Sequence, residues 1–440
     1  MLANVNDVSA KEYEERSYKD TSLPMLDSPR PLQPHLFDSA AWVYLLTCCR
    51  NKSQAVVTWF VTHLVSFADT NIVGNRGITG LGKSSSQRLF LNQILRLSAY
   101  SKKELKLAEQ IKALDTVLVS FGNAKTLMNP NASHHGRYLE LHFNERGRIS
   151  ATKVLTFGLD KTCLNCLTHE ECTYHVFYQF LAGTTPAEWD HFNLEDVSNY
   201  TLLTSSGCYR LPSGPFSDDS IAIADLRVAM RTLGFKPKHI TSIFTLLIAI
   251  LLLGNLQFAN GNSHDVSAHV SNSHVLDQAA RLLGISAEEL GQIFTNYVRK
   301  ELFTVLLNAE NSGKQSDQCV RDLYAILVAF VVETSNHWLA PAKEDPPSTQ
   351  IILFNQPGFQ TQGLAGTSSM SLLGTQPLIS AYSQNGFDKF CINFADEMLQ
   401  SHVLHHTFEN SIGYNECMVQ DAVTLPSIST MDNGACIELL

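Results

Sequence analysis

The chain has 440 residues, of which 44% are hydrophobic and 17% charged, and its formal net charge at pH 7 is −10. This length accommodates roughly two or three domains, and the apolar content is that of a packed globular protein. Lysine and arginine are scattered along the chain, which together with the acidic charge argues against nucleic acid as a ligand. The longest apolar run, residues 243–253, is too short to cross a bilayer, so we expect a buried core helix and no membrane span in this chain.

The ten cysteines lack the regular spacing of a small secreted disulfide scaffold. Residues 1–30 are polar and acidic, unlike a secretory signal. We therefore expect a reducing, cytoplasmic environment.

The segment before residue 76 is the least regular part of the chain. Residues 1–34 carry charges and prolines but few large apolar side chains, so we expect a disordered lead-in. A helix is expected at about 37–49, and residues 53–57 predict the buried strand that delivers a chain into a phosphate-binding loop. Residues 58–75 separate this strand from the loop. We interpret them as an atypical insert, with a translated, unspliced intron as the hypothesis.

The next stretch fits the phosphate-binding pattern G-x-x-x-x-G-K-[ST] at every fixed position. In such a loop the glycines let backbone N–H groups turn toward anionic oxygens, Lys83 adds charge at the β/γ-phosphates, and Ser84 offers its hydroxyl to Mg²⁺. Residues 85–97 have apolar side chains at helical spacing, which predicts a helix whose positive N-terminal end faces the phosphates. The predicted nucleotide-binding residues of this loop are Gly77, Ile78, Thr79, Gly80, Leu81, Gly82, Lys83 and Ser84.

The middle of the chain changes from strands to helices. Residues 138–143 alternate with period two and predict a strand, and residues 144–147 predict a hairpin turn before a further strand. Helices are expected to dominate from about 170 to 340. A capping box at residues 286–289 starts one of them.

The last hundred residues return to a strand and end in a helix. Residues 351–354 predict a short buried strand that ends in the polar segment 355–360. A linker rich in Gly, Ser, Thr and Gln follows at 361–384, and residues 387–408 predict a helix.

A cysteine and histidine cluster between residues 163 and 175 has spacing that resembles a metal site. No second cluster completes a four-ligand set, so we favour a structural role over a zinc site. The cluster comprises Cys163, Cys166, His169, Cys172 and His175.

Three loops in this order, residues 77–84, 129–137 and 355–360, resemble the phosphate loop, first switch and second switch of a myosin motor head. The supporting stretches resemble the same family: FGNAKT at 121–126, YHVFYQFLAG at 174–183, LGNLQF at 253–258 and CINFADEMLQ at 391–400. The resemblance covers about residues 35–440. It is strongest to the divergent motor-like domain of certain fungal chitin synthases.

This resemblance implies an α/β fold of the P-loop NTPase class and of myosin-head type, with a mixed central sheet flanked by many helices. It also implies a chain that is incomplete at both ends. The expected parts are a nucleotide-binding core at 35–158, a mainly helical upper subdomain at 159–345, and the second switch, linker and relay-like helix at 346–440.

The resemblance further implies ATP with Mg²⁺ as the ligand. It assigns Asn129, Ser133 and Gly358 to nucleotide binding and Ser84 and Ser133 to the metal. The resemblance implies that the switch arginine, aspartate and glutamate of motile myosins are all replaced in this chain, so no catalytic residue is assigned. These degenerate switch positions are His134, Asn355 and Gln360.

The function expected from this pattern is a degenerate, truncated motor domain of a chitin synthase. It would bind nucleotide, hydrolyse ATP weakly or not at all, and act as a tethering or interaction module in cell-wall chitin synthesis. An active actin-based motor ATPase and a non-functional gene-model fragment are the alternatives. The expected location is cytoplasmic, at the cell periphery through a membrane-bound parent protein, with actin as a partner of a full-length head.

Overall fold

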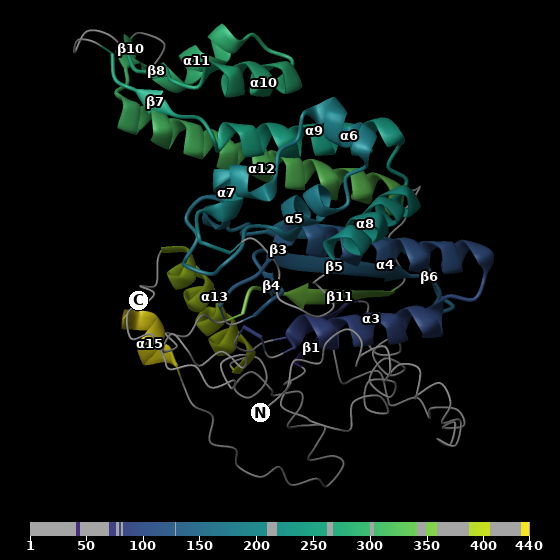
Figure 1. The fold of residues 1–440 in the computed structure, drawn as a ribbon. Coiled ribbons are helices and arrows are strands. Elements are labelled where there is room, and N and C mark those ends of the chain that lie inside the picture. The colour runs from purple at the N-terminus through teal and green to yellow at the C-terminus, as the bar shows by residue number, and fades with distance from the viewer. Residues whose placement is uncertain are drawn as a thin grey trace, which may run out of the picture. The chain divides into compact units, whose positions relative to one another are not determined.

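The computed structural model describes residues 41–44, 70–75, 79–80, 82–127, 129–208, 218–261, 267–299, 303–340, 349–358, 387–404 and 433–439. The chain divides into two compact units. Unit 1 comprises Met1–Ala108, Gly136–Phe157 and Ala340–Leu440, and unit 2 comprises Glu109–His135 and Gly158–Leu339. Figure 1 shows the elements of both.

Unit 1 is built on a five-stranded mixed sheet with the strand order β1-β2-β11-β5-β6. β11 is parallel to β2. β11 and β6 are both antiparallel to β5 (Figure 1). The strands are β1 (Ala41–Tyr44), β2 (Thr70–Asn75), β5 (Gly136–Phe143), β6 (Ile149–Phe157) and β11 (Thr349–Asn355).

The inner strands of this sheet carry its core. β11 has a continuous buried run, Ile351, Ile352 and Leu353, as expected for a strand with neighbours on both sides and covered faces. β5 alternates buried and partly exposed positions, which confirms the strand and the hairpin predicted from the sequence.

Two expectations for the segment before the phosphate loop are wrong. Within the predicted helix 37–49, the described residues form strand β1, which pairs in parallel with β2. The strand that leads into the phosphate loop is β2 and not residues 53–57, which lie outside the described residues. β2 carries only two buried apolar side chains, Ile72 and Val73, so its pattern is too short to identify a strand without its partners.

Helices complete unit 1. α3 (Lys83–Ser98) follows the phosphate loop and buries Phe90, Leu91, Ile94 and Leu95, which confirms the predicted helix. The first residues of α4 (Lys102–Gly122) also belong to this unit. α13 (Phe387–Leu404) confirms the helix predicted near the end of the chain, and α15 (Gly434–Leu439) contacts it. The lead-in at 1–34 and the linker at 361–384 lie outside the described residues.

Unit 2 is mainly helical. Its α-helices after α4 are α5 (His175–Ala182), α6 (Pro186–Phe192), α7 (Thr201–Thr204), α8 (Asp219–Leu233), α9 (Pro237–Leu253), α10 (Ser273–Leu283), α11 (Ala287–Thr295) and α12 (Ala309–Leu339). Two short 3₁₀ helices, η2 (Lys161–Leu164) and η3 (Val197–Asn199), lie between them in the chain. The short strands are β3 (Asn123–Ala124), β4 (Ala132–Ser133), β7 (Phe258–Ala259), β8 (His269–Val270), β9 (Asn296–Arg299) and β10 (Phe303–Leu306).

α9 is the core helix of unit 2. Every residue from 247 to 253 is buried, and the helix packs against α10 and α12 (Figure 1). This confirms the buried helix predicted from the longest apolar run. Among the described residues, no helix combines the length and apolar character needed to span a membrane.

The capping box predicted at residues 286–289 is also present. Ser286 and Glu289 form a reciprocal capping box at the start of α11. Gly234 ends α8 with a φ of 100°, a left-handed conformation that favours glycine.

The burial of α9 predicts a large effect of truncation at Leu251, which is fully buried. Leu251→Ala removes apolar contacts and leaves a cavity, so we expect it to lower the free energy of unfolding by about 2–5 kcal/mol. Ile326→Ala on α12 is the control, because this side chain is 62% exposed and its truncation is expected to change stability by less than about 0.5 kcal/mol. Thermal or chemical denaturation measures both variants, and equal effects would contradict the assignment of α9 as the core.

Candidate nucleotide site

The phosphate loop has the backbone that its glycines predict. Gly80 and Gly82 have φ values of 81° and 85°, which favour glycine. Gly82 is the N-cap of α3, no side chain caps the helix, and its first turn has no acidic residue. Since the first N–H groups of a helix need a partner, this end of α3 suits an anion. Gly77, Ile78 and Leu81 lie outside the described residues.

Lys83 is the buried cation of this loop, with 7% of its surface exposed. Burial lowers its pKa to about 8, while the negative charge of Asp396 acts in the opposite direction. Asp396 lies on α13, and its Oδ1 accepts a hydrogen bond of 2.8 Å from Nε2 of Gln356. The ammonium group is therefore mostly protonated at neutral pH and can attract a phosphate.

The second switch contacts the phosphate loop inside unit 1. Nδ2 of Asn355 donates to Oγ of Ser84 at 3.3 Å, and Oδ1 of Asn355 is buried without a hydrogen-bond partner among the described residues. A Cβ atom added to Gly358 would lie 2.5 Å from Nζ of Lys83 and 2.5 Å from the backbone nitrogen of Thr79. Only glycine therefore fits at this position. Gln360 lies outside the described residues.

The base of α3 is tied to the sheet by a buried polar pair. Nη2 of Arg137, on β5, donates to Oε1 of Gln87 at 2.8 Å. Both side chains are buried. This contact holds the first turns of α3 and so supports the position of Lys83 and Ser84.

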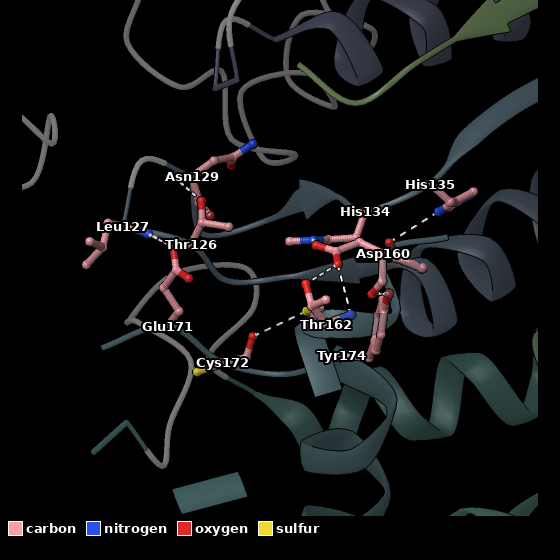
Figure 2. Close-up of polar contacts among 12 residues, drawn as sticks. Thr126, Leu127, Asn129, His134, His135, Asp160, Thr162, Glu171, Cys172 and Tyr174 are labelled. Atoms are coloured by element: carbon pink, nitrogen blue, oxygen red, sulfur yellow. Dashed lines mark hydrogen bonds and ion pairs between the residues drawn. The ribbon is translucent and has the colours of Figure 1, made fainter. Parts of the chain in front are cut away.

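Residues 129–135 of the first switch belong to unit 2, and short polar contacts fix their conformation (Figure 2). The carbonyl oxygen of Asn129 accepts from the backbone N–H of Thr126 at 2.9 Å, and Oδ1 of Asn129 accepts from the N–H of Asn131 at 3.0 Å. Ser133 lies on β4 and pairs with Asn123 of β3. The two ends of the loop that carries Asn129 and Ser133 are thus joined by the pairing of β3 with β4.

Asn131 links this loop to α5. Its Oδ1 accepts from Nδ2 of Asn123 at 2.8 Å and lies 3.1 Å from Nε2 of His175. Burial and the nearby charge of His134 lower the pKa of His175 to about 3, so its ring is neutral at physiological pH. Because Oδ1 can only accept, Nε2 of His175 carries the proton.

His134 is paired with a carboxylate inside unit 2. Its Nδ1 lies 3.1 Å from Oδ2 of Asp160, and its ring meets that of Tyr174 edge to face (Figure 2). Asp160 is fixed in turn: Oδ1 accepts from the N–H of Thr162 at 3.0 Å, and its carbonyl accepts from the Tyr174 hydroxyl at 2.6 Å.

The electrostatics of this pair favour two opposite charges. Burial disfavours the charged imidazole, but its hydrogen bonds with Asp160 and Cys163 and the negative charge of Asp160 outweigh burial, and the pKa of His134 lies well above its usual value. Burial alone raises the pKa of Asp160, but hydrogen bonds from His134 and Thr162 lower it to about 2. Burial also raises the pKa of the Cys163 thiol, which keeps this sulfur protonated at neutral pH.

The residues of unit 1 fit a nucleotide with Mg²⁺. An uncapped helix N-terminus, a buried lysine and the hydroxyl of Ser84 are the donors that the phosphates and the metal require. The unmatched Oδ1 of Asn355 is an acceptor for a metal-bound water. Within the described residues, no group of three or more His, Cys, Asp or Glu side chains is arranged to hold a metal ion, and this includes the cluster at 163–175.

Two carboxylates of the site were not predicted from the sequence: the one that pairs with His134 and the one that acts on Lys83. Asp160 is 26 residues from His134 in sequence, and Asp396 is far from Lys83. The turn sequence at residues 160–162 is a signal for a capping aspartate, but it does not reveal the histidine partner. No local pattern indicates that Asp396 lies near Lys83.

The phosphate loop between a strand and a helix, beside a mixed sheet, defines a P-loop NTPase fold. Residues 30–363 match the model of the myosin head (motor domain) family. The chain therefore belongs to the myosin head family.

Individual relatives come from two groups. The chain is 31% identical to chitin synthase 5 of Cryptococcus neoformans var. grubii over 93% of its length. It is 29% identical to chitin synthase 8 of Mycosarcoma maydis over 92% of its length. Over 93% of the chain it is 27% identical to unconventional myosin heavy chain 6 of Caenorhabditis elegans. The matches cover 19%, 18% and 17% of these relatives, so the chain spans about a fifth of their length.

The contact at Gly358 predicts that a single methyl group disturbs the site. Gly358→Ala forces Lys83 or Thr79 to move, and we expect a loss of about 1–3 kcal/mol in unfolding free energy together with weaker nucleotide binding. Gly313→Ala on α12 is the matched control, because nothing lies within 4 Å of its added Cβ. That helical substitution is expected to be neutral or stabilising. A Gly358→Ala variant as stable as Gly313→Ala would contradict the close approach.

The His134 and Asp160 pair predicts a pH-dependent stability. Because the pKa of His134 is higher in the folded than in the unfolded chain, the pair stabilises the fold fully below about pH 6.5, the pKa of histidine in the unfolded chain. This stabilisation is lost as the pH rises through the pKa of His134 in the folded chain. The lowered pKa of Asp160 contributes stability above about pH 4, and this is lost as the pH falls toward 2. Asp160→Asn is therefore expected to destabilise unit 2 most between about pH 4 and pH 6.5, by about 1–3 kcal/mol.

Denaturation across this pH range measures the effect. Asp317→Asn on α12 is the control, because Asp317 is exposed and its substitution is expected to leave stability nearly unchanged at every pH. An Asp160→Asn effect that does not vary with pH would show that the pair is not ionised.

Proposed function

We propose that this chain is a myosin motor-like domain that binds ATP with Mg²⁺ weakly and hydrolyses it slowly or not at all. The observation that carries the proposal is the neutral contact between Asn355 and Ser84 at the metal-binding position. An active actin-based motor is the competing function, and the same experiments separate the two.

Binding is supported by the groups that remain in unit 1. The N-terminus of α3, the buried ammonium of Lys83 and the hydroxyl of Ser84 all suit a triphosphate and its metal. Bound ATP with Mg²⁺ supplies the transferable phosphoryl group and the metal charge that polarises it. Within unit 1, Ser84 is the residue that would hold the metal through its hydroxyl.

Weak hydrolysis is supported by the groups that are missing. Phosphoryl transfer depends on positioning and on neutralising the charge that spreads over the γ-phosphate oxygens. Asn355 offers an amide where a carboxylate would add negative charge to the outer shell of the metal, and so holds metal-bound water less firmly. His134 directs its Nδ1 to Asp160, and an imidazole cannot make the bidentate contact of a guanidinium.

The relatives support a proposal for the biological role. Two of the most similar proteins are named chitin synthases and span about five times the length matched here. We infer that this domain tethers a longer, chitin synthase-like protein at the cell periphery, with nucleotide-dependent contacts to partners such as actin. Catalytic glycosyl transfer is then a property of other parts of such a protein.

Lys83 provides the direct test of binding. With a fluorescent ATP analogue and Mg²⁺, we expect a Kd in the micromolar range or weaker for the unmodified chain, and at least about a tenfold loss for Lys83→Ala, the effect of removing one charge-assisted hydrogen bond. Lys103→Ala is the control, since Lys103 is exposed on α4. If Lys83→Ala and Lys103→Ala bind equally, the fluorescence reports a site other than the phosphate loop.

The lowered pKa of Lys83 predicts how binding changes with pH. Only the protonated amine attracts a phosphate, and its pKa without ligand is about 8. Affinity is therefore expected to fall above pH 8, by up to about tenfold per pH unit. Lys83→Arg is the matched control, because a guanidinium stays charged throughout this range. Parallel pH profiles for the two proteins would contradict a titrating lysine in the site.

A further inference from the structure

Two cysteines of unit 2 lie in direct contact. Sγ of Cys172 and Sγ of Cys208 are 3.3 Å apart, and both residues are thiols in the structure. Cys172 is 1% exposed, and Cys208 is half-buried. The pair is separated by 36 residues in sequence, so the fold and not the local chain brings it together.

A lysine side chain lies beside one member of the pair. Nζ of Lys125 lies 3.2 Å from Sγ of Cys208 and 2.7 Å from the carbonyl oxygen of Glu170. A cation beside a thiol stabilises the thiolate, and the thiolate is the form that reacts with oxidants. Cys208 therefore combines an activating charge with partial exposure, whereas Cys172 is shielded.

We propose that Cys172 and Cys208 are a peroxide-sensitive dithiol that closes to a disulfide. The Cys208 thiolate attacks the O–O bond of a hydroperoxide and becomes a sulfenic acid, with hydroxide as the leaving group. Cys172, on losing its proton, attacks this sulfur, forms the S–S bond and displaces a second hydroxide. The two thiol protons convert both hydroxides to water, so each hydrogen peroxide oxidises two sulfurs and yields two waters.

The disulfide acts at the base of the first-switch loop. The N–H of Cys172 donates to the carbonyl oxygen of Lys125 at 3.0 Å, and Oε1 of Glu171 accepts from the N–H of Leu127 at 3.4 Å (Figure 2). Oxidation removes the negative charge on the sulfur that Lys125 contacts. It also joins Cys172, whose backbone hydrogen-bonds to Lys125 at the start of this loop, covalently to Cys208. This places a redox-sensitive bond beside the segment that carries Asn129 and Ser133, and it does not depend on whether nucleotide is hydrolysed.

Non-reducing peptide mapping tests the proposal. The folded, soluble chain is treated with hydrogen peroxide, blocked with N-ethylmaleimide, digested and analysed by mass spectrometry. We expect a cross-linked peptide pair containing Cys172 and Cys208 that has lost two hydrogens and that dithiothreitol separates. Lys125→Met is expected to slow its formation about tenfold at pH 7, as for a thiol pKa about one unit higher.

Two cysteine variants control this measurement. Cys208→Ser is expected to leave Cys172 as an alkylated thiol, and Cys166→Ser, which removes an exposed cysteine, is expected to leave the cross-link unchanged. The proposal is overturned if the cross-link forms no faster in the folded chain than in urea, or if Cys208 is oxidised to sulfinic acid while Cys172 stays a thiol. An unchanged rate in Lys125→Met overturns the activating role of the lysine.

Discussion

The nucleotide half of this protein depends on the parallel pairing of β2 with β11. Six residue pairs are in register, from Thr70 with Gln350 to Asn75 with Asn355. Since the carboxyl ends of parallel strands meet at one edge of a sheet, the phosphate loop after β2 and the second switch after β11 start side by side. The hydrogen bond from Asn355 to Ser84 and the close approach of Gly358 to Lys83 both follow from this register.

Charge distribution separates binding from catalysis in this arrangement. β11 ends in the amide of Asn355, while carboxylates lie elsewhere: the buried Asp396 acts on Lys83, and the partly buried Asp160 lies beside His134. These acids balance cations of the protein itself. A triphosphate would still meet Lys83 and the N-terminus of α3, but it would meet fewer groups able to organise water and metal around the γ-phosphate.

Sequence patterns predicted those features that are local. The structure confirms the helix after the phosphate loop, the hairpin of β5 and β6, the capping box at Ser286 and helix α13, each of which depends on residues close in sequence. The short strands β1 and β2 were missed because each is defined by its pairing with another strand, which no local pattern records. Asp160 and Asp396 were missed because their partners are distant in sequence and no local spacing records such contacts.

Phosphate release from ATP tests the central claim most directly, because it separates a site that only holds nucleotide from one that turns it over. The chain is mixed with ATP and Mg²⁺ under single-turnover conditions, with and without filamentous actin, beside Lys83→Ala as the background. The Asn355 amide and the His134 imidazole predict release no faster than in Lys83→Ala under both conditions. Release that actin stimulates and that Lys83→Ala abolishes would contradict this, and would show that His134 and Asn355 still support a working motor.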